Sequence, residues 1–266
     1  MKISIVTISF NQADFLERAI LSIVNQNYKD LEYIIIDPGS TDSSRDIIEK
    51  YKLHFSKIIF KLDAGAADGL NNGFKYASGD IFGFLNSDDV LLPDCLNKVD
   101  KFFQENPSID IVSGHSRIID SSDQVIRNSY SDIFSLIAYA YGVNLLMQPS
   151  TFFRASCYYK VNGFNPNNLS NWDGELFVDI ALNSGKFSLI NEFLSCYRLH
   201  ALSITSSKKI DDKIKKYRNY IFRKIMKRNK QVFDIPIRVF FRILKYLYTP
   251  KSLYERITKG AIYGRS

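Results

Sequence analysis

The chain has 266 residues, of which 45% are hydrophobic, 14% aromatic and 24% charged. This apolar content suffices for one large globular domain, or a domain with an appendage, and excludes a disordered polypeptide. No run approaches the ~20 apolar residues that cross a bilayer, and the first residues lack a signal-peptide cleavage site, so we expect a cytoplasmic protein.

The net charge of +7 is unevenly distributed along the chain. Residues 208–266 contain 18 Lys and Arg against 4 Asp and Glu, a net charge of +14. The remaining residues, 1–207, therefore carry a net charge of −7. This asymmetry predicts an acidic body and a basic tail that faces an anionic partner.

Strands and helices alternate through about the first hundred residues. Apolar, β-branched runs predict strands at 3–10, 31–37, 57–62 and 80–86, and helical spacing predicts helices at 13–26, 45–51, 67–77 and 93–106. Pro93 is expected at the start of the last of these helices. The alternation implies right-handed crossovers and a mostly parallel sheet covered by helices on both faces.

The second half of the chain is less regular. Residues 109–130 predict a hairpin and 131–141 a short aromatic helix. We then expect a strand at 147–154, a helix and turn at 155–164, a helix at 173–185 and strand pieces at 187–200. In the basic tail, Arg238, Arg242 and Lys245 fall at helical spacing on an otherwise apolar segment, which predicts an amphipathic helix.

Polar side chains follow four of the predicted strands. They are Ser9 and Asn11, then Asp37, then Asp63, then Asn86, Asp88 and Asp89. Because parallel sheets bind ligands at the carboxyl ends of their strands, we interpret these residues as one functional cluster rather than scattered loop residues. The adjacent carboxylates of Asp88 and Asp89 repel each other, and a Mg²⁺ or Mn²⁺ ion bridging to a diphosphate would compensate them.

Asp37 precedes Pro38 and Gly39, which fix a turn suited to contact with a base or ribose. The alternative is an ordinary strand-to-helix turn capped by Asp42 or Ser43. No GxGxxG follows the first strand and no GxxxxGK[ST] occurs, so dinucleotide-binding and P-loop interpretations lose their main support.

Six segments in order resemble the inverting nucleotide-sugar glycosyltransferases of family 2, which have the GT-A fold. They are "SIVTISFNQ", "IIIDPGSTDSS", "DAGAADGLNNGFKYASGDIFGFLNSDD", "MQPSTFFR", "GFNPNNLSNWDGELFVDIAL" and "YRLHALSIT". The resemblance implies a Rossmann-like GT-A domain over 1–205, with a nucleotide-binding half at 1–105 and an acceptor-binding half at 106–205. Residues 206–266 would form a basic, amphipathic helical tail. The bacterial surface-polysaccharide enzymes are the type it resembles.

The resemblance also implies roles for individual residues. It implies that Asp37 accepts from the nucleobase, that Asp88 lies near the ribose or metal, that Asp89 is the principal metal ligand and that Asp173 is the general base. Further donor contacts would come from Ser9, Asn11, Asp68, Asn71 and Arg198, and a neutral His200 would ligate the metal. Two departures matter, because Asn86 replaces an acidic residue of the metal motif and Trp172 replaces one before the base. Glu175 therefore remains a rival base.

The implied reaction is metal-dependent transfer of a sugar, with inversion, to a hydroxyl of a glycan or polyprenyl-diphosphate-linked acceptor. We expect UDP-hexose or UDP-N-acetylhexosamine as donor, with dTDP-rhamnose second, and Mn²⁺ or Mg²⁺ as cofactor. A sugar-1-phosphate nucleotidyltransferase is the nearest alternative, but the glycine-rich basic loop expected of it is missing from "SFNQADF". Nucleic-acid binding through the tail is a third interpretation; no motif accompanies it, and we expect no nucleic-acid partner.

The tail has two further interpretations. An apolar helix with a basic stripe suits the headgroup layer of an anionic membrane, so residues 208–259 would hold the enzyme at the inner face of the cell membrane. Alternatively, its apolar faces pack on the catalytic body or on a second copy of the chain. A transferase is expected to keep donor hydrolysis when the tail is deleted, whereas a nucleic-acid binder would lose its activity.

Overall fold

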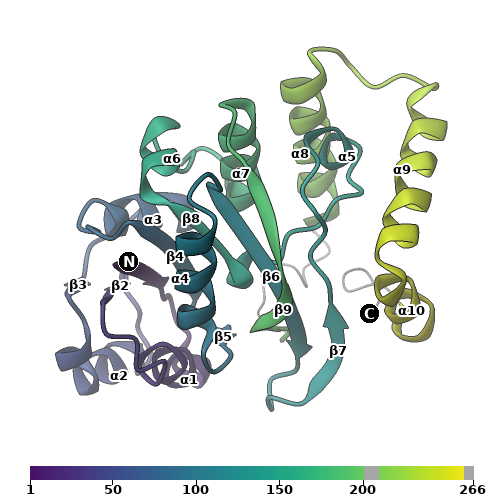
Figure 1. Cartoon of the computed structure of the whole chain (residues 1–266). Coiled ribbons are helices and arrows are strands. Elements are labelled where there is room, and N and C mark those ends of the chain that lie inside the picture. The colour runs from purple at the N-terminus through teal and green to yellow at the C-terminus, as the bar shows by residue number, and fades with distance from the viewer. Residues whose placement is uncertain (201–209, 261–266) are drawn as a thin grey trace.

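The computed structural model describes residues 1–200 and 210–260, with side chains omitted for 210–214 (Figure 1). The strands are β1 (Ile3–Ile8), β2 (Leu31–Ile36), β3 (Lys57–Ile59), β4 (Ile81–Asn86), β5 (Val90–Leu91), β6 (Ile111–Ile119), β7 (Val125–Ser129), β8 (Thr151–Arg154) and β9 (Phe187–Arg198). The α-helices are α1 (Ala13–Val24), α2 (Ser44–Lys50), α3 (Ala66–Phe74), α4 (Cys95–Glu105), α5 (Leu136–Ala140), α6 (Ala155–Lys160), α7 (Trp172–Leu182), α8 (Ile210–Met226), α9 (Asp234–Tyr248) and α10 (Pro250–Lys259). Two 3-10 turns, η1 (Lys52–His54) and η2 (Gln148–Ser150), complete the secondary structure of the described residues.

The strands form one sheet in the order β3-β2-β1-β4-β8-β6-β9-β5, with β7 paired to the outer half of β6. The first four strands are parallel, as the alternating sequence predicts. Beyond them the sheet is mixed, because β8 runs antiparallel to both of its neighbours while β6 and β9 run parallel. The α/β class is therefore confirmed, and the parallel part is the half built by the first hundred residues.

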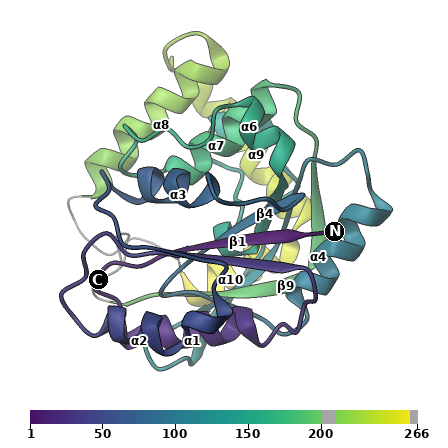
Figure 2. The ribbon, with the colours of Figure 1, turned by 90° about the vertical axis from the view of Figure 1, so that its left-hand side faces the viewer.

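Helices cover both faces of the sheet (Figure 2). Successive strand residues point to opposite faces, so Ile35 packs among α1, α2 and α4, whereas Ile34 and Ile36 pack under α3, α6 and α7. Both clusters consist of buried apolar side chains, most of them aliphatic or aromatic. These two cores hold the strand ends in fixed positions relative to one another.

Several boundaries differ from the sequence-based expectation. Pro93 does not begin a helix, because α4 starts at Cys95 after Asp94, which has a left-handed φ of 63°. The segment expected as strand pieces is one strand, β9, which bends at register shifts opposite His115. The predicted hairpin is present as β6 and β7, and the predicted strand at 147–154 begins with the turn η2.

The C-terminal helices pack against the body rather than standing apart from it (Figure 1). Val178 of α7 is buried together with Tyr217 and Ile221 of α8. On α9, Lys245 pairs with Asp132 at 2.8 Å. Within the described residues, no helix is both long and apolar enough to span a membrane. The division of the chain at residues 105 and 205 stays a prediction.

Candidate functional site

The loops after β1, β2 and β4 begin side by side. Ile8 is in register with Ile36 on one side and with Asn86 on the other. The Ser9 N–H extends the pairing by donating to the Ile36 carbonyl at 2.9 Å. The polar residues that follow these strands therefore meet at one edge of the sheet, as the sequence predicts.

Three buried oxygens at this edge have no hydrogen-bond partner among the described residues. They are Ser9 Oγ, Asp37 Oδ2 and Asp89 Oδ2. Ser9, Asp37 and Asp89 are each at most 2% exposed. A buried polar atom without a partner costs folding free energy, and three of them at one edge point to a polar ligand that satisfies them.

Asp37 is held by the turn that follows it. Its Oδ1 accepts from the Gly39 and Ser40 N–H groups at 2.9 and 2.8 Å and from Arg45 Nε at 3.1 Å. Asn11 supports the same loop, since its side-chain oxygen accepts from the Thr41 N–H at 2.8 Å. These contacts aim the free Oδ2 of Asp37 without occupying it.

The capping by Asp42 that the sequence offered as an alternative is also present in this turn. Asp42 accepts from the Ser44 N–H at 3.0 Å and from the Ala13 N–H at 2.9 Å. Asp42 therefore ties the start of α2 to the start of α1. This leaves Asp37 free for another role.

Two more acidic residues lie beside Asp37. Burial raises the pKa of Asp63, and the nearby carboxylates of Asp68 and Asp37 raise it further. Asp68 lies in the first turn of α3 and accepts from the Ala64 N–H at 3.1 Å. Asn71 faces the other way, because it accepts from Tyr158 Oη at 2.8 Å and donates to the Phe164 carbonyl at 2.8 Å. Its contacts are structural, and its predicted contact with the donor stays a prediction.

Asp88 and Asp89 have different surroundings. The Asp88 side chain is partly exposed and its Oδ2 lies 3.1 Å from His200 Nε2. Asp89 is 1% exposed and accepts from the Arg198 N–H at 2.9 Å. Burial, together with the neighbouring Asp88, raises the pKa of Asp89 well above its ordinary value. Asp88 is thus the carboxylate that faces out, and Asp89 the one that faces in.

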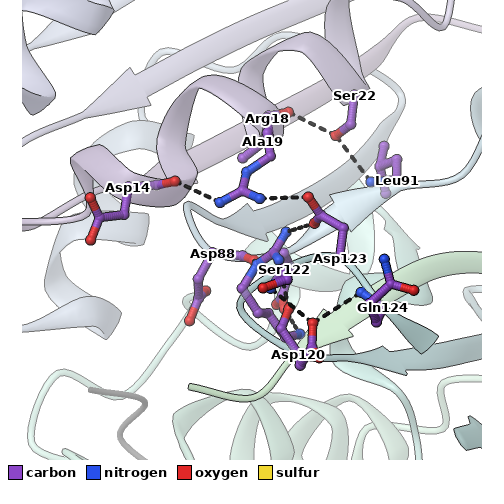
Figure 3. A network of polar contacts seen from close by, with 12 residues as sticks. Asp14, Arg18, Ala19, Ser22, Asp88, Leu91, Asp120, Ser122, Asp123 and Gln124 are labelled. Carbon is purple, nitrogen blue, oxygen red and sulfur yellow. Dashed lines mark hydrogen bonds and ion pairs between the residues drawn. The ribbon is translucent and has the colours of Figure 1, made fainter. Parts of the chain in front are cut away.

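Arg198 holds this loop from behind. Its Nε donates to the Asp88 carbonyl at 2.7 Å, and one terminal nitrogen donates to the Asp120 carbonyl at 2.8 Å. The other terminal nitrogen pairs with Asp123 at 2.6 Å. In Figure 3 the side chain of Asp88 points away from the Asp120–Asp123 loop. Arg198 is 1% exposed, so this geometry favours a positioning role over the direct diphosphate contact expected from the sequence.

The pair of Asp88, whose side chain is 21% exposed, and His200, whose side chain is 5% exposed, fits a divalent cation. A carboxylate and a neutral imidazole are both accepted ligands of Mn²⁺, and Mg²⁺ keeps most of its positions for water and phosphate. The part of the chain that the structure describes holds no cluster of three or more His, Cys, Asp or Glu that could bind a metal alone. A cation at this pair would therefore take its remaining ligands from a bound diphosphate and water.

Asp173 lies at the start of α7, close to the same edge. Its neighbour Trp172 packs on Phe84 of β4 and on Phe164, each at a ring-centroid distance of 5.3 Å. Burial raises the pKa of Asp173, although the N–H groups of Asp173 and Gly174 oppose the rise. The carboxylate is therefore more basic than an ordinary Asp, as a general base at a helix start requires.

The rival base, Glu175, is 2% exposed and already fully engaged. It accepts from Tyr220 Oη at 2.6 Å, Asn168 Nδ2 at 2.7 Å and Lys224 Nζ at 2.9 Å. Burial raises the pKa of Glu175, but these hydrogen bonds outweigh it and the pKa is lowered. The geometry makes Glu175 a connector between α7, α8 and the 165–168 loop.

Sequence reasoning missed the residues that surround these groups. A Cβ on Gly174 would collide with Tyr139 Oη, and Tyr217 Oη would lie 2.9 Å from it. These tyrosines come from α5 and α8, far from Asp173 in sequence. Asp120 and Asp123, which contact the Arg198 guanidinium, belong to a hairpin loop whose sequence is that of an ordinary turn. No local pattern in the sequence connects either set to the site.

Comparisons with known proteins identify the relatives of this chain. The model of the family described as Glycosyl transferase family 2 matches residues 4–160. An uncharacterised glycosyltransferase of Nostoc sp. is 30% identical over 211 residues, which cover 75% of this chain and 65% of that protein. Chondroitin synthase of Pasteurella multocida is 28% identical over 220 residues, which cover 81% of this chain but only 22% of that enzyme.

Solved structures show the same fold. The crystal structure of S. aureus TarS 1–349 in complex with UDP has a TM-score of 0.66 and 16% identity, covering 97% of this chain and 72% of that one. A mannosyltransferase from Pyrobaculum calidifontis in complex with GDP-Man and Mn²⁺ has a TM-score of 0.65 and 16% identity, covering 99% and 76%.

Proposed function

Because the chain belongs to glycosyl transferase family 2 and is a glycosyltransferase with the GT-A fold, we propose that it transfers a sugar from a nucleoside-diphosphate donor, with inversion. The observation that carries this proposal is the edge formed by β1, β2 and β4. It combines three unpartnered buried oxygens with the pair formed by the partly exposed Asp88 and the mostly buried His200. A nucleotide needs hydrogen-bond acceptors for its base and ribose and a counter-charge for its diphosphate.

The donor binds across this edge. Asp37 Oδ2 accepts an N–H of the base, and Ser9 and Asp68 contact the nucleoside. UDP-hexose or UDP-N-acetylhexosamine is our first choice of donor, supported by the UDP that the similar TarS structure contains. The similar mannosyltransferase contains GDP-Man, so the base is the property to test first.

Asp88 and His200 hold the divalent cation in this proposal, and Asp89, the principal ligand that the family resemblance implies, offers its unpartnered Oδ2 from the buried side. Asp89 Oδ1 accepts from the Arg198 N–H and so fixes the loop. The cation would neutralise the charge that develops on the departing diphosphate. Mn²⁺ is favoured over Mg²⁺, because Mn²⁺ accepts an imidazole more readily.

Asp173 acts as the general base. It removes the proton from an acceptor hydroxyl, whose oxygen forms a bond to the anomeric carbon as the bond to the diphosphate oxygen breaks. The nucleoside diphosphate leaves with the bonding electron pair, and the sugar is inverted in one displacement. Tyr139 and Tyr217, beside Gly174, limit the space around the carboxylate.

The acceptor is a glycan, free or linked to a polyprenyl diphosphate, in the synthesis of a bacterial surface polysaccharide such as O-antigen or capsule. The similarity to chondroitin synthase supports a polysaccharide product. We place the enzyme in the cytoplasm, on the inner face of the cell membrane. The reason for a membrane location lies in the surface of α9.

One face of α9 is apolar and lies opposite the face that packs on the body. Ile235, Val239, Ile243 and Leu247 follow one another at four-residue spacing and are each at least 51% exposed. Exposed arginines at 238 and 242 flank this stripe. Figure 1 shows α9 on the outside of the molecule. Apolar side chains beside cations match the headgroup layer of an anionic membrane.

The membrane contact is tested by flotation with vesicles containing phosphatidylglycerol. The wild type is expected to float, and Val239→Ser/Ile243→Ser to lose most of this binding. Leu53→Ser/Ile133→Ser removes two exposed apolar side chains elsewhere and serves as the control. If the stripe instead forms an interface between two copies of the chain, the wild type does not float. In that case Val239→Ser/Ile243→Ser elutes from gel filtration at a different volume from the wild type.

The donor and cation sites are tested together by thermal shift. UDP, dTDP, GDP, CMP and ADP are compared with and without Mn²⁺, on wild type, Asp88→Asn and Asp89→Asn. We expect one nucleotide to stabilise the wild type in a Mn²⁺-dependent way, and Asp88→Asn to remove the dependence on Mn²⁺. Asp89→Asn removes a buried charge whose pKa is raised, so it should weaken the Mn²⁺-dependent stabilisation without lowering the unfolding temperature of the nucleotide-free protein. A folded wild type that responds to no nucleotide contradicts the proposal.

A further inference from the structure

A large hollow lies between α8 and the loop before α7, outside the sheet edge described above. It has a volume of about 890 Å³ and is lined by residues 165–170 on one side and by α8 and the following loop on the other. Tyr217 lines it, and the Tyr217 hydroxyl also lies beside Gly174, next to Asp173. One side chain, the mostly buried Tyr217, therefore separates the hollow from the start of α7 and the proposed base.

The lining is rich in amides and hydroxyls. It includes the side chains of Asn165, Asn167, Asn168, Ser170, Asn219 and Asn229. The ring of Tyr220 also lines the hollow and is 38% exposed. Amides and hydroxyls hydrogen-bond to sugar hydroxyls, and an exposed aromatic ring offers a flat face to the C–H side of a sugar. Such a lining suits a carbohydrate.

The charge of the lining is positive. Lys216, Arg223 and Lys230 contribute three cations, and Glu175 is the only carboxylate among the lining residues. The Glu175 charge is already met by Lys224 at 2.9 Å. Within the described residues, Lys216 and Arg223 are exposed and take part in none of the ion pairs. These two cations are therefore available to a ligand.

The cations are spread along the hollow rather than gathered at one point. Lys216 and Arg223 are seven residues apart on the same face of α8, a separation of roughly 10 Å along the helix axis. Cations spaced along the helix axis in this way can contact acidic groups on different sugars of one chain. The arrangement favours an acidic oligosaccharide.

We propose that this hollow, lined by Lys216, Tyr220 and Arg223, is the subsite for an acceptor glycan that carries acidic sugars. The proposal rests on the proposed transferase function, and it names the class of acceptor. A chain bound here extends from the amide-lined hollow past Tyr217 toward Asp173. Its terminal sugar then presents a hydroxyl to the base.

The test measures binding of two hexasaccharides by calorimetry at low salt. Chondroitin hexasaccharide is the acidic probe and chitohexaose is the neutral one. The wild type is expected to bind the acidic probe at least about fivefold more tightly, and to lose the difference as salt rises. Lys216→Gln/Arg223→Gln should weaken binding of the acidic probe at least about fivefold and leave the neutral one unchanged.

Lys215→Gln/Lys227→Gln is the matched control. It removes the same charge from the same helix region, but neither residue lines the hollow. Thermal stabilisation by UDP and Mn²⁺ is measured on all three proteins, because it reports the donor site alone. Normal donor binding without preference for the acidic probe, or an equal effect of the control variant, overturns the acceptor proposal. If UDP and Mn²⁺ do not stabilise even the wild type, the result instead contradicts the proposed transferase mechanism.

Discussion

Asp173 and Glu175 are two residues apart, and the structure predicts opposite consequences for removing each charge. Asp173→Asn removes the proposed base while leaving its surroundings intact. Loss of a general base slows the chemical step by ~10²–10⁴-fold. The Asp173 side chain makes no ion pair among the described residues. The unfolding temperature of the Asp173→Asn variant should therefore differ little from that of the wild type. The measurements are kcat for sugar transfer and a thermal melt of the same sample.

Glu175→Gln should show the reverse pattern. It leaves Lys224 with Asp179 as its remaining partner, at 2.6 Å, and weakens the hydrogen bonds to the 165–168 loop. Leaving a buried charge without any partner costs ~3 kcal/mol or more, and because Lys224 keeps Asp179 we expect a smaller cost of about 2 kcal/mol. For a chain of 266 residues this corresponds to a fall of about 4 °C in the unfolding temperature. Activity below the melt should remain within about tenfold of wild type.

Asp179→Asn is the control for the second variant, since it removes the other carboxylate from Lys224 and leaves the Glu175 contacts in place. It should lower the unfolding temperature by less than Glu175→Gln. The reasoning fails if Glu175→Gln abolishes transfer at an unchanged unfolding temperature while Asp173→Asn remains active.

Three further outcomes follow from individual contacts. Burial raises the pKa of Glu32, but hydrogen bonds from Lys2 and nearby serines outweigh burial and bring the pKa to about 2. Glu32→Gln should therefore lower the free energy of unfolding by at most about 3 kcal/mol at pH 7. That cost should disappear as pH falls from about 4.5 to about 2, which urea unfolding at several pH values measures. The raised pKa of Asp173 means that kcat/KM should rise with pH through a pKa above that of an ordinary Asp, and a pH–rate profile checks this. Arg198→Lys cannot reach both the Asp88 and Asp120 carbonyls, so Mn²⁺-dependent UDP binding should weaken by about tenfold; unchanged calorimetric binding would exclude the positioning role.

The sheet edge could be predicted from sequence because parallel topology determines it. Once strands at 3–8, 31–36 and 81–86 are recognised, their carboxyl ends must be neighbours, and Ser9, Asp37 and Asp88 follow. The family model and the fold comparisons confirm the family and the fold class that the six segments predicted. The residue assignments stay predictions, but the structure distinguishes among them by burial.

What the sequence could not supply are contacts made across long chain separations. The sequence does not distinguish the neighbouring residues Asp88 and Asp89. Only the position of β9 in the fold shows that the Arg198 N–H donates to Asp89 and not to Asp88. Asp173 and Glu175 likewise read as two acidic residues in one helical turn. Their difference arises because α8, some 45 residues later, places Tyr220 against Glu175. Tertiary packing, not local propensity, separates a base from a connector.

The same packing changes what deletion of the tail can test. Removing residues 206–266 would strip Tyr220 and Lys224 from the buried carboxylate of Glu175 and uncover Val178. Loss of donor hydrolysis in that protein would therefore reflect damage to α7, and would say nothing about nucleic acid. The informative truncation ends at residue 227, after α8, and removes α9 and α10 with the apolar stripe.

The shorter truncation is expected to keep Mn²⁺-dependent UDP binding and to stop floating with anionic vesicles. It uncouples Asp132 and Tyr141 from their partners on α9, Lys245 and Asp234, so a lower unfolding temperature is expected. The Glu175 contacts survive because they come from α8. If UDP binding is lost from a protein that still melts cooperatively, α9 and α10 contribute to the donor site, and the assignment of that site to the edge of β1, β2 and β4 is incomplete.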